Sequence, residues 1–549
     1  MKTRHGKTRK LWALMLATVL ALSACAPAPA PSANPANSGT PQPGASSGEK
    51  IITMAMIDPW TSFFPFAGGG GARNTAVQSL IFDALATTLN DGTVMPRLAK
   101  SWDVSEDGRT FTFHLNENAK WHDGENVTAH DVEWTYKTCS DPNANVTQRS
   151  TLRYYEGTND DGSSVTPGSI AVKALDDYTV EMTLKAPTSD STLFAITLGE
   201  VVLPKHLLEN VPVESLETDE FWRNPIGSGP LKFTSMIDGE RIEFDANKDY
   251  FLGAPEFDKF VVRVVPSSGL LAGLMSGDID ILAGGQIGVL PLADFRMAQE
   301  EANLVTENVS SYTYQYVSLN NSSPLLSDVR VRKAIDMAID KQRIVDELLG
   351  GYGKVACMPW AVNHPYFKEG LTVNKYDVEG AKALLREAGW DESVTMTLGV
   401  PANNSFRESA ALLVQQDLEK VGIKTTIRQY DSAALFDALT SGSIELGMVG
   451  SAGSVDPNEP CNLFNPSGAW CFGCLPDNRY WDLFTEGLAY TSFNDRKAVY
   501  DQLQTMIDEE VPYSYLCNPD ILMTYNSRIS NVRLVDFGIT YPVWEWKIA

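Results

Sequence analysis

The chain has 549 residues, a length that is too great for one small domain and indicates two or three. Its 44 Lys and Arg stand against 69 Asp and Glu, so the formal net charge at pH 7 is −25. Such an acidic surface repels phosphate backbones and excludes nucleic acid as a partner.

The first predicted element is an export signal. Five basic residues precede an uncharged apolar run over 11–20, which is too short to span a bilayer as a mature helix. The run closes on Leu22-Ser23-Ala24-Cys25, which resembles a bacterial lipobox. The resemblance implies a signal peptide over 1–24 and a diacylglyceryl group on Cys25, which would hold the protein at the outer face of the cell membrane. The alternative is a plain secretory signal with a chance cysteine.

The segment after Cys25 is predicted to be a tether. Residues 26–48 include six prolines and no charged side chain, so they have little to bury and should be disordered. We therefore predict a linker over 25–50 and folding from about Ile51. No later stretch of the sequence is apolar enough over a sufficient length to be a transmembrane candidate.

The folded part reads as α/β. Residues 110–115 alternate polar and apolar side chains, which is typical of a half-buried strand, and 259–266 form a strand ended by proline. The second half then alternates helices and strands, which predicts a sheet covered by helices. The predicted helices are 328–349, 377–389, 405–421 and 433–439, and the predicted strands are 423–429 and 444–449. Asp377 is expected to start the second helix and Gly389 to end it, and Ser405 with Glu408 is expected to form a capping box at the third.

Six cysteines remain besides Cys25, and an even number outside the cytoplasm suggests disulfides. Cys461, Cys471 and Cys474 cluster in one loop-like segment. The CxxC formed by the last two could serve redox chemistry or zinc, but no histidine or second CxxC is near, and the context is not that of a thioredoxin motif. We predict a structural disulfide from Cys461 to Cys471 or Cys474, and no metal.

Short motifs follow one another along the folded part in a fixed order. They include Pro225-Ile226-Gly227-Ser228-Gly229-Pro230 and the helix that starts with Asp328-Val329-Arg330-Val331-Arg332. The remaining matching segments are 98–115, 121–132, 247–251, 276–280, 376–390 and 456–457. Together they resemble the dipeptide/oligopeptide family of ABC solute-binding proteins, over nearly all of 51–549.

The resemblance implies a fold. It is the two-lobed periplasmic-binding-protein-like fold of type II, in the large class with an extra domain, and two hinge strands join its lobes. By resemblance, lobe I comprises 51–87, 200–311 and 518–549, the extra domain 88–199, and lobe II 312–517. The crossovers are expected near 312–320 and 511–517. Because the extra domain is a scaffold, we interpret its histidines as structural or surface residues and not as metal ligands: His114, His122 and His130.

The resemblance also implies a function. Such a protein captures di- or oligopeptides by closing its lobes and delivers them to a permease that is driven by separate ATPase subunits. It works as a monomer, without a cofactor and without catalysis. The sequence agrees, since residues 51–549 contain no Gly-x-Ser-x-Gly elbow and no His-Glu-x-x-His helix.

Candidate ligand-binding residues come from positions that match the family. Gly69, Gly70 and Gly71 lie where relatives run backbone along the ligand, although a flexible surface loop is an equal alternative. Tyr316 lies on a predicted hinge strand facing the cleft. Trp470 and Tyr513 are candidates for the cleft wall, with core packing as the alternative.

The loop 450–457 departs from the family pattern. Peptide-binding relatives often have an aromatic residue here, followed by an aspartate that pairs with the peptide's ammonium. This chain has Gly450 and Gly453 at those positions, with Ser451 between them. Asp456 remains, but its counterpart is more often a turn residue. Either another carboxylate takes the ammonium, or the ligand has no free amino terminus.

These glycines keep other ligands open within the same fold. An oligosaccharide, a nickel chelate, an opine or haem would each be compatible with a cleft that lacks the ammonium partner. A surface sensor or chaperone role is a further alternative that sequence does not separate from uptake. A hydrolase is disfavoured by the missing motifs.

Overall fold

The structure is a computed structural model, and Glu49–Ala549 form one compact unit in it. It describes residues 48–66, 71–88, 94–146, 149–188, 201–284, 287–402, 404–466, 471–472, 478–533 and 542–549. The predicted signal peptide, Cys25 and nearly all of the predicted linker lie outside these residues. Among the described helices, none combines the length and apolar content that a membrane span requires.

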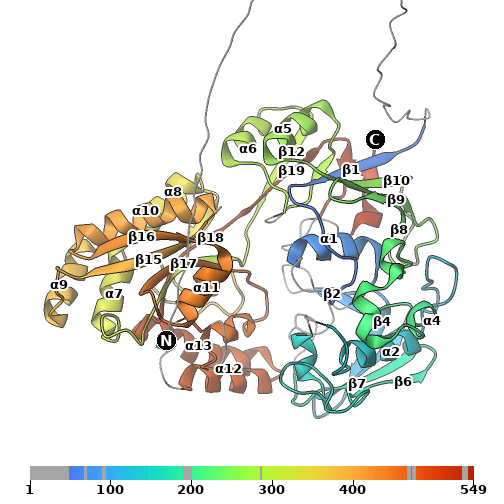
Figure 1. The fold of residues 1–549 in the computed structure, drawn as a ribbon, viewed down its shortest axis with the longest axis horizontal. Helices are drawn as coiled ribbons and strands as arrows, with labels where there is room; N and C mark the ends of the chain where they lie inside the picture. Colours follow the sequence, from blue (N-terminus) through green and yellow to red (C-terminus); the bar gives the residue numbers. More distant parts are fainter. Residues whose placement is uncertain are drawn as a thin grey trace, which may run out of the picture. The chain divides into compact units, whose positions relative to one another are not determined.

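A seven-stranded mixed sheet gathers strands from both ends of the folded chain, in the order β12-β19-β11-β1-β10-β9-β8 (Figure 1). β1 lies between β10 and β11 and runs parallel to both, whereas the other pairs are antiparallel. The strands are β1 (Ile51–Met56), β8 (Leu231–Ile237), β9 (Arg241–Ala246), β10 (Lys259–Val264), β11 (Ile281–Leu282), β12 (Leu304–Val309) and β19 (Ile521–Asn526).

A four-stranded antiparallel sheet, β4-β5-β7-β6, shares one hydrophobic core with the seven-stranded sheet. Its strands are β4 (Ala99–Val104), β5 (Thr110–Leu115), β6 (Val172–Asp176) and β7 (Thr179–Thr183). The alternation predicted for 110–115 is confirmed, because Phe111, Phe113 and Leu115 are buried while the residues between them are only partly buried. The helices that accompany the two sheets are α1 (Gly71–Ile81), α2 (Ala129–Cys139), α4 (Lys205–Leu208), α5 (Ser267–Ser276) and α6 (Leu292–Ala298).

Short elements complete this part of the chain. Two strand pairs stand apart from the larger sheets, and short 3-10 helices connect longer elements. They are β2 (Ala86–Thr88) with β3 (Val94–Pro96), β20 (Ile529–Ser530) with β21 (Lys547–Ile548), and η1 (Ser150–Tyr154), η2 (Val213–Thr218), η3 (Glu220–Arg223) and η5 (Val543–Glu545).

A six-stranded sheet, β14-β18-β13-β17-β15-β16, is built from the second half of the chain. Its strands are β13 (Tyr314–Leu319), β14 (Gly353–Val355), β15 (Thr395–Pro401), β16 (Lys424–Tyr430), β17 (Leu446–Ser451) and β18 (Tyr513–Pro519). β15 runs parallel to β16 and β17, which confirms the alternation of helices and strands expected from the sequence.

Helices cover this sheet and enclose two separate cores. One core contains Val317, Leu398 and Leu516, and the other contains Tyr314, Tyr316 and the helical residue Tyr500. The helices are α7 (Val329–Ala338), α8 (Lys341–Leu348), α9 (Val378–Ala388), α10 (Ser405–Lys420), α11 (Ser432–Thr440), α12 (Arg479–Ala489) and α13 (Phe493–Glu510), and the 3-10 helix η4 spans Glu459–Phe464.

Two predicted helix boundaries need correction. The helix expected over 328–349 is two helices, because Asp340 leaves the helical conformation and its carboxylate accepts the Arg343 N–H at 3.0 Å, which starts α8. The capping box expected at Ser405 is absent. Asn404 is the N-cap instead, and its side chain accepts the Arg407 N–H at 2.9 Å.

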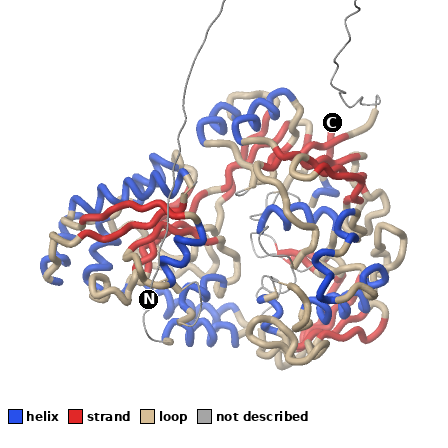
Figure 2. Tube along the Cα trace, in the orientation of Figure 1, coloured by secondary structure: helices blue, strands red, loops and turns tan. Residues whose placement is uncertain are grey.

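The chain passes between the seven- and six-stranded sheets twice. β12 continues into β13, and β18 continues into β19, so that two neighbouring strands run from one sheet to the other (Figure 2). In the six-stranded sheet β13 pairs with β18, with an irregularity between Gln315 and Tyr316. A bulge of this kind bends a strand and re-aims its side chains, and it lies next to the pocket described below.

Candidate ligand site beside the paired strands

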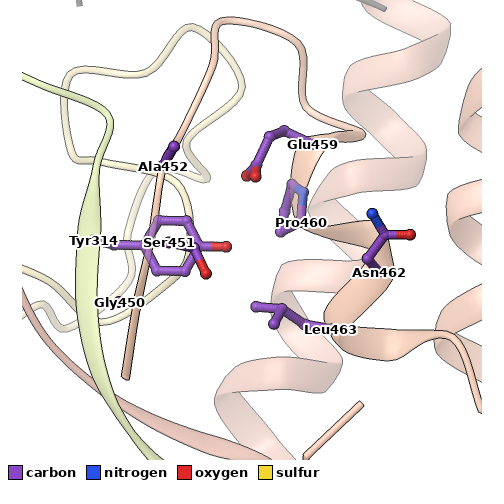
Figure 3. Close-up of a pocket in the computed structure, with 8 residues that line it drawn as sticks. All are labelled: Tyr314, Gly450, Ser451, Ala452, Glu459, Pro460, Asn462 and Leu463. Carbon is purple, nitrogen blue, oxygen red and sulfur yellow. The ribbon is translucent and has the colours of Figure 1, made fainter. Parts of the chain in front are cut away.

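A pocket of about 270 Å³ lies at the end of the β13–β17 pair. β13 contributes Tyr314, the end of β17 contributes Gly450 and Ser451, and η4 forms the opposite side (Figure 3). Its lining residues are Tyr314, Gly450, Ser451, Ala452, Glu459, Pro460, Asn462 and Leu463. Antiparallel pairing sets Tyr314 directly opposite Ser451, which explains why residues far apart in sequence meet here.

Four tyrosines from β13 and β18 stack beside the pocket. The ring centroids of Tyr314 and Tyr316 are 5.7 Å apart, and those of Tyr316 and Tyr515 are 5.9 Å apart. Tyr513 packs on Tyr316 and donates its hydroxyl to the Leu463 carbonyl at 2.6 Å. Tyr513 therefore holds η4 against the sheet, and burial raises its pKa well above the ordinary value.

The other three hydroxyls, on Tyr314, Tyr316 and Tyr515, are buried and have no hydrogen-bond partner among the described residues. Burial raises the pKa of Tyr314 and Tyr316, and the nearby Ser451 side chain lowers it by less. Burial dominates, and it raises the pKa of all three tyrosines. A buried polar group without a partner costs about 1–3 kcal/mol, so this cluster is a place where a bound group would find donors.

Glu459 is the acidic residue of the pocket. Figure 3 shows its carboxylate turned toward the strand that carries Ala452. Burial, followed by the negative charge of Asp456, raises its pKa to about 8. Within the described part of the chain, no cation and no hydrogen-bond donor contacts this carboxylate.

Asp456 lies three residues earlier but has its charge satisfied internally. It is buried, its carboxylate accepts the Asn458 N–H at 2.8 Å, and Arg496 pairs with it at 3.2 Å. The Arg496 guanidinium lies over the rings of Tyr366 and Tyr500, at 5.5 and 5.6 Å from their centroids. The structure thus gives Asp456, predicted as a ligand contact, the role of fixing the loop.

His364 holds the same loop from the other side. Its Nδ1 accepts the Tyr366 N–H at 3.1 Å, so Nε2 carries the proton and donates to the Ser454 carbonyl at 3.1 Å. Burial lowers the pKa of this imidazole to about 4. The side chain is therefore neutral at physiological pH.

The two glycines of the loop are required by close packing. A Cβ at Gly453 would overlap the main-chain carbonyl of Tyr312. A Cβ at Gly450 would meet Gln315 and the guanidinium of Arg407, whose Nε donates to Gln315 Oε1 at 2.9 Å. Main chain therefore closes the Gly453 position, whereas a side chain at Gly450 would require Arg407 and Gln315 to move.

The sequence and the fold are shared with known proteins. The sequence profile described as "Bacterial extracellular solute-binding proteins, family 5 Middle" matches residues 93–470. The chain belongs to this family. Its fold is the two-lobed α/β fold of periplasmic binding proteins, with two strand connections between the lobes.

Individual relatives agree along the whole chain. The oligopeptide-binding protein AppA of Bacillus subtilis (strain 168) is 27% identical over 579 residues, covering 100% of both chains. The structure of Bacillus subtilis AppA with a nonapeptide superposes with a TM-score of 0.74 at 25% identity, over 91% of this chain and 99% of that one. NikZ of Campylobacter jejuni with Ni(L-His) also gives 0.74, at 24% identity over 90% and 99%.

Against the family pattern, the structure explains the departure noted in the sequence. At Gly453, where an aspartate is expected in relatives, the Tyr312 carbonyl leaves no space for a side chain, and at Gly450 the ends of Arg407 and Gln315 occupy the space. Gly450 and Ser451 do line the pocket, whereas Gly453 and Asp456 shape the loop behind it. Tyr316 lies two residues after Tyr314 on β13, is fully buried, and is not among the residues that line the pocket.

Other predicted site residues fall elsewhere. Gly71 is the first residue of α1, whereas Gly69, Gly70, Trp470 and Cys474 lie outside the described residues. Cys461 is a buried free thiol, which corrects the prediction that it forms a disulfide. Burial raises the pKa of that thiol to about 12. Cys471 is disulfide-bonded, to a partner that is not among the described residues.

The sequence reasoning missed Tyr314 and Glu459. Strand alternation offered a signal for Tyr314, because it lies two residues before Tyr316 and so faces the same side of β13. No local pattern marks Glu459, whose environment comes from η4 packing against β13 and β17.

Replacing Gly453 by alanine should destabilise the protein by more than about 2 kcal/mol, since the new methyl group would overlap a main-chain atom. Gly389→Ala is the matched control, because Gly389 has open space around its Cβ position and only its φ of 71° is unfavourable. The control should cost about 1 kcal/mol. Urea unfolding measures both, and equal costs would contradict the close approach at Gly453.

His364 should make stability depend on pH. The unfolded imidazole takes a proton near pH 6.5 and the folded one near 4, so folding stability is complete above pH 6.5 and falls as pH drops toward 4. The loss from this group should reach about 3 kcal/mol. Unfolding midpoints of the wild type and His364→Gln at pH 7 and 4.5 measure it. The same pH-dependent loss in both proteins would show that His364 does not titrate this way.

Proposed function

We propose that this chain is the ligand-capturing component of an ABC importer and that its ligands are peptides. The observation that carries the proposal is the pocket at the paired strands, where main chain, unpaired hydroxyls and a carboxylate converge beside the connections between two lobes. Similarity to the full length of an oligopeptide-binding protein supports the choice of ligand.

The site chemistry suits an extended peptide. Gly450, Ser451 and Ala452 line the pocket at the end of β17, and we propose that a peptide bonds to their main chain, which leaves its own side chains unspecified. The tyrosines of β13 and β18 supply rigid walls that lose little conformational entropy on binding. Such a site recognises the peptide backbone and tolerates varied sequences.

We assign the parts of the chain as follows. Lobe I comprises 51–87, 200–311 and 518–549, the extra domain comprises 88–199, and lobe II comprises 312–517. The seven-stranded sheet falls in lobe I and the six-stranded sheet falls almost entirely in lobe II, since only the last two residues of β18 pass 517. Ligand binding closes the lobes about the two strand connections, and the closed form is delivered to a permease with its ATPase subunits. The protein acts as a monomer that binds its ligand without converting it.

We propose that the N-terminal segment anchors the protein to the cell membrane. A lipid on Cys25 and the proline-rich linker after it would tether the folded part to the outer face of the membrane, within reach of the permease.

One observation favours a second candidate, which is a ligand without a free amine. Gly453 leaves no space for the aspartate that many peptide-binding relatives use. A nickel chelate, an opine, haem or an oligosaccharide would not need that carboxylate, and NikZ with Ni(L-His) has the same fold.

A peptide library should raise the melting temperature of the folded part, residues 49–549, and sugars or nickel–histidine should not. At a hundredfold excess over Kd a ligand stabilises by about 2.7 kcal/mol, which thermal-shift measurement detects readily. Solution scattering on the same samples should show a smaller radius with peptide. If nickel–histidine or a sugar gave the shift and no peptide did, the peptide assignment would be wrong.

Cys25→Ser should release the full-length protein from the membrane, because the serine hydroxyl does not replace the thiol that receives the lipid. Fractionation of cells that express the wild type or the variant, with detection by antibody, measures the distribution. Cys461→Ser is the control, since that thiol is buried and should not affect anchoring. Retention of Cys25→Ser at the membrane would contradict the anchor.

A further inference from the structure

Two polar groups of the pocket, one partly buried and one fully buried, have no partner among the described residues. The Glu459 carboxylate has no counter-charge within the described residues, and the Tyr314 hydroxyl has no hydrogen-bond partner although its side chain is fully buried. In Figure 3 the Tyr314 ring extends from β13 toward η4, while the Glu459 carboxylate turns toward the strand that carries Ala452. Both groups therefore face the same space from opposite sides.

Among the described residues no positive charge acts on the Glu459 carboxylate, although the guanidinium of Arg407 lies against Gly450 in the pocket lining. Asp456 is the neighbour that raises the pKa of Glu459, and Arg496 is already engaged by Asp456. The other titratable groups that respond to Glu459 are Tyr314, Tyr316, Tyr515 and Cys461, all of which are neutral at physiological pH. Arg153 acts on Cys461 but not on Glu459. A cation that entered the pocket would therefore meet an uncompensated carboxylate.

We infer that Glu459, with the Tyr314 hydroxyl beside it, is the subsite for the amino-terminal ammonium of a bound peptide. The inference rests on the proposed function and specifies which end of the peptide enters this pocket. It also answers how an ammonium is received when Gly453 cannot carry a carboxylate: the charge is supplied six residues later, from the opposite side of the pocket.

A charge pair of this kind couples binding to protons. Glu459 is largely protonated below pH 8, whereas a peptide ammonium stays protonated until about pH 8. Forming the pair at pH 6.5 expels the proton from Glu459, so binding releases about one proton. The affinity should rise as pH increases from 6 to 8 and fall above it, as the amine loses its proton.

Calorimetry on residues 49–549 tests the subsite by measuring the affinity for two ligands. They are the peptide of the library that binds most tightly and the same peptide with an acetylated amino terminus. Glu459→Gln keeps the shape and removes the charge. It should weaken the free-amine peptide at least about tenfold and leave the acetylated copy unchanged. Titrations at pH 6.5 in two buffers of different ionisation enthalpy should show release of about one proton for the wild type and none for the variant.

Two further variants control for structure. Glu419→Gln removes an exposed carboxylate from α10 and should bind the peptide as the wild type does. Tyr314→Phe breaks no hydrogen bond, so it should melt at or above the wild-type temperature and yet bind the free-amine peptide several-fold more weakly.

The outcomes separate the two proposals. If no library peptide binds the wild type, the proposed function fails and this subsite fails with it. If peptides bind but Glu459→Gln changes neither affinity nor proton release, only the subsite is overturned. If an acetylated peptide with a lysine regains Glu459-dependent binding, the ammonium comes from a side chain, and the amino-terminal assignment is overturned.

Discussion

The pairing of β13 with β18 is the constraint on which the site depends. These neighbouring strands continue into β12 and β19, so the same two segments connect both lobes and carry the stacked tyrosines. Tyr513 bonds to the Leu463 carbonyl and fixes η4, which brings Glu459 to the pocket. A change in this pairing would alter the lobe connections and the pocket together.

Two carboxylates three residues apart have opposite roles because their surroundings differ. Asp456 has Arg496 and a main-chain N–H as partners, so its burial is compensated and it holds the loop. Glu459 receives neither, and its pKa rises to about 8. An uncompensated carboxylate is unfavourable in the empty protein, and it is suited to a ligand that brings its own positive charge.

The loop glycines show how one fold can serve different ligands. The main-chain carbonyl of Tyr312 lies where a side chain at Gly453 would extend, and the side chains of Arg407 and Gln315 lie where one at Gly450 would extend. The fold tolerates this exchange because the lobes and their connections do not depend on which residue faces the ligand. Ligand choice therefore depends on the few groups that line the pocket, and family membership alone does not determine it.

The sequence by itself determined the family, the α/β class and most elements, since caps and alternation act within a few residues: Asp377 and Gly389 bound α9 as expected. Local rules failed at two positions. They did not predict the break at Asp340, and they assigned the cap of the third predicted helix to Ser405 where the structure has Asn404. Only the tertiary structure decided the site. The main chain of Tyr312 limits the space at Gly453, and Arg496 forms the ion pair with Asp456. The packing of η4 on the sheet places Glu459 away from any counter-charge among the described residues. These effects join residues up to about 150 positions apart, and desolvation and steric exclusion depend on distance in space rather than along the chain.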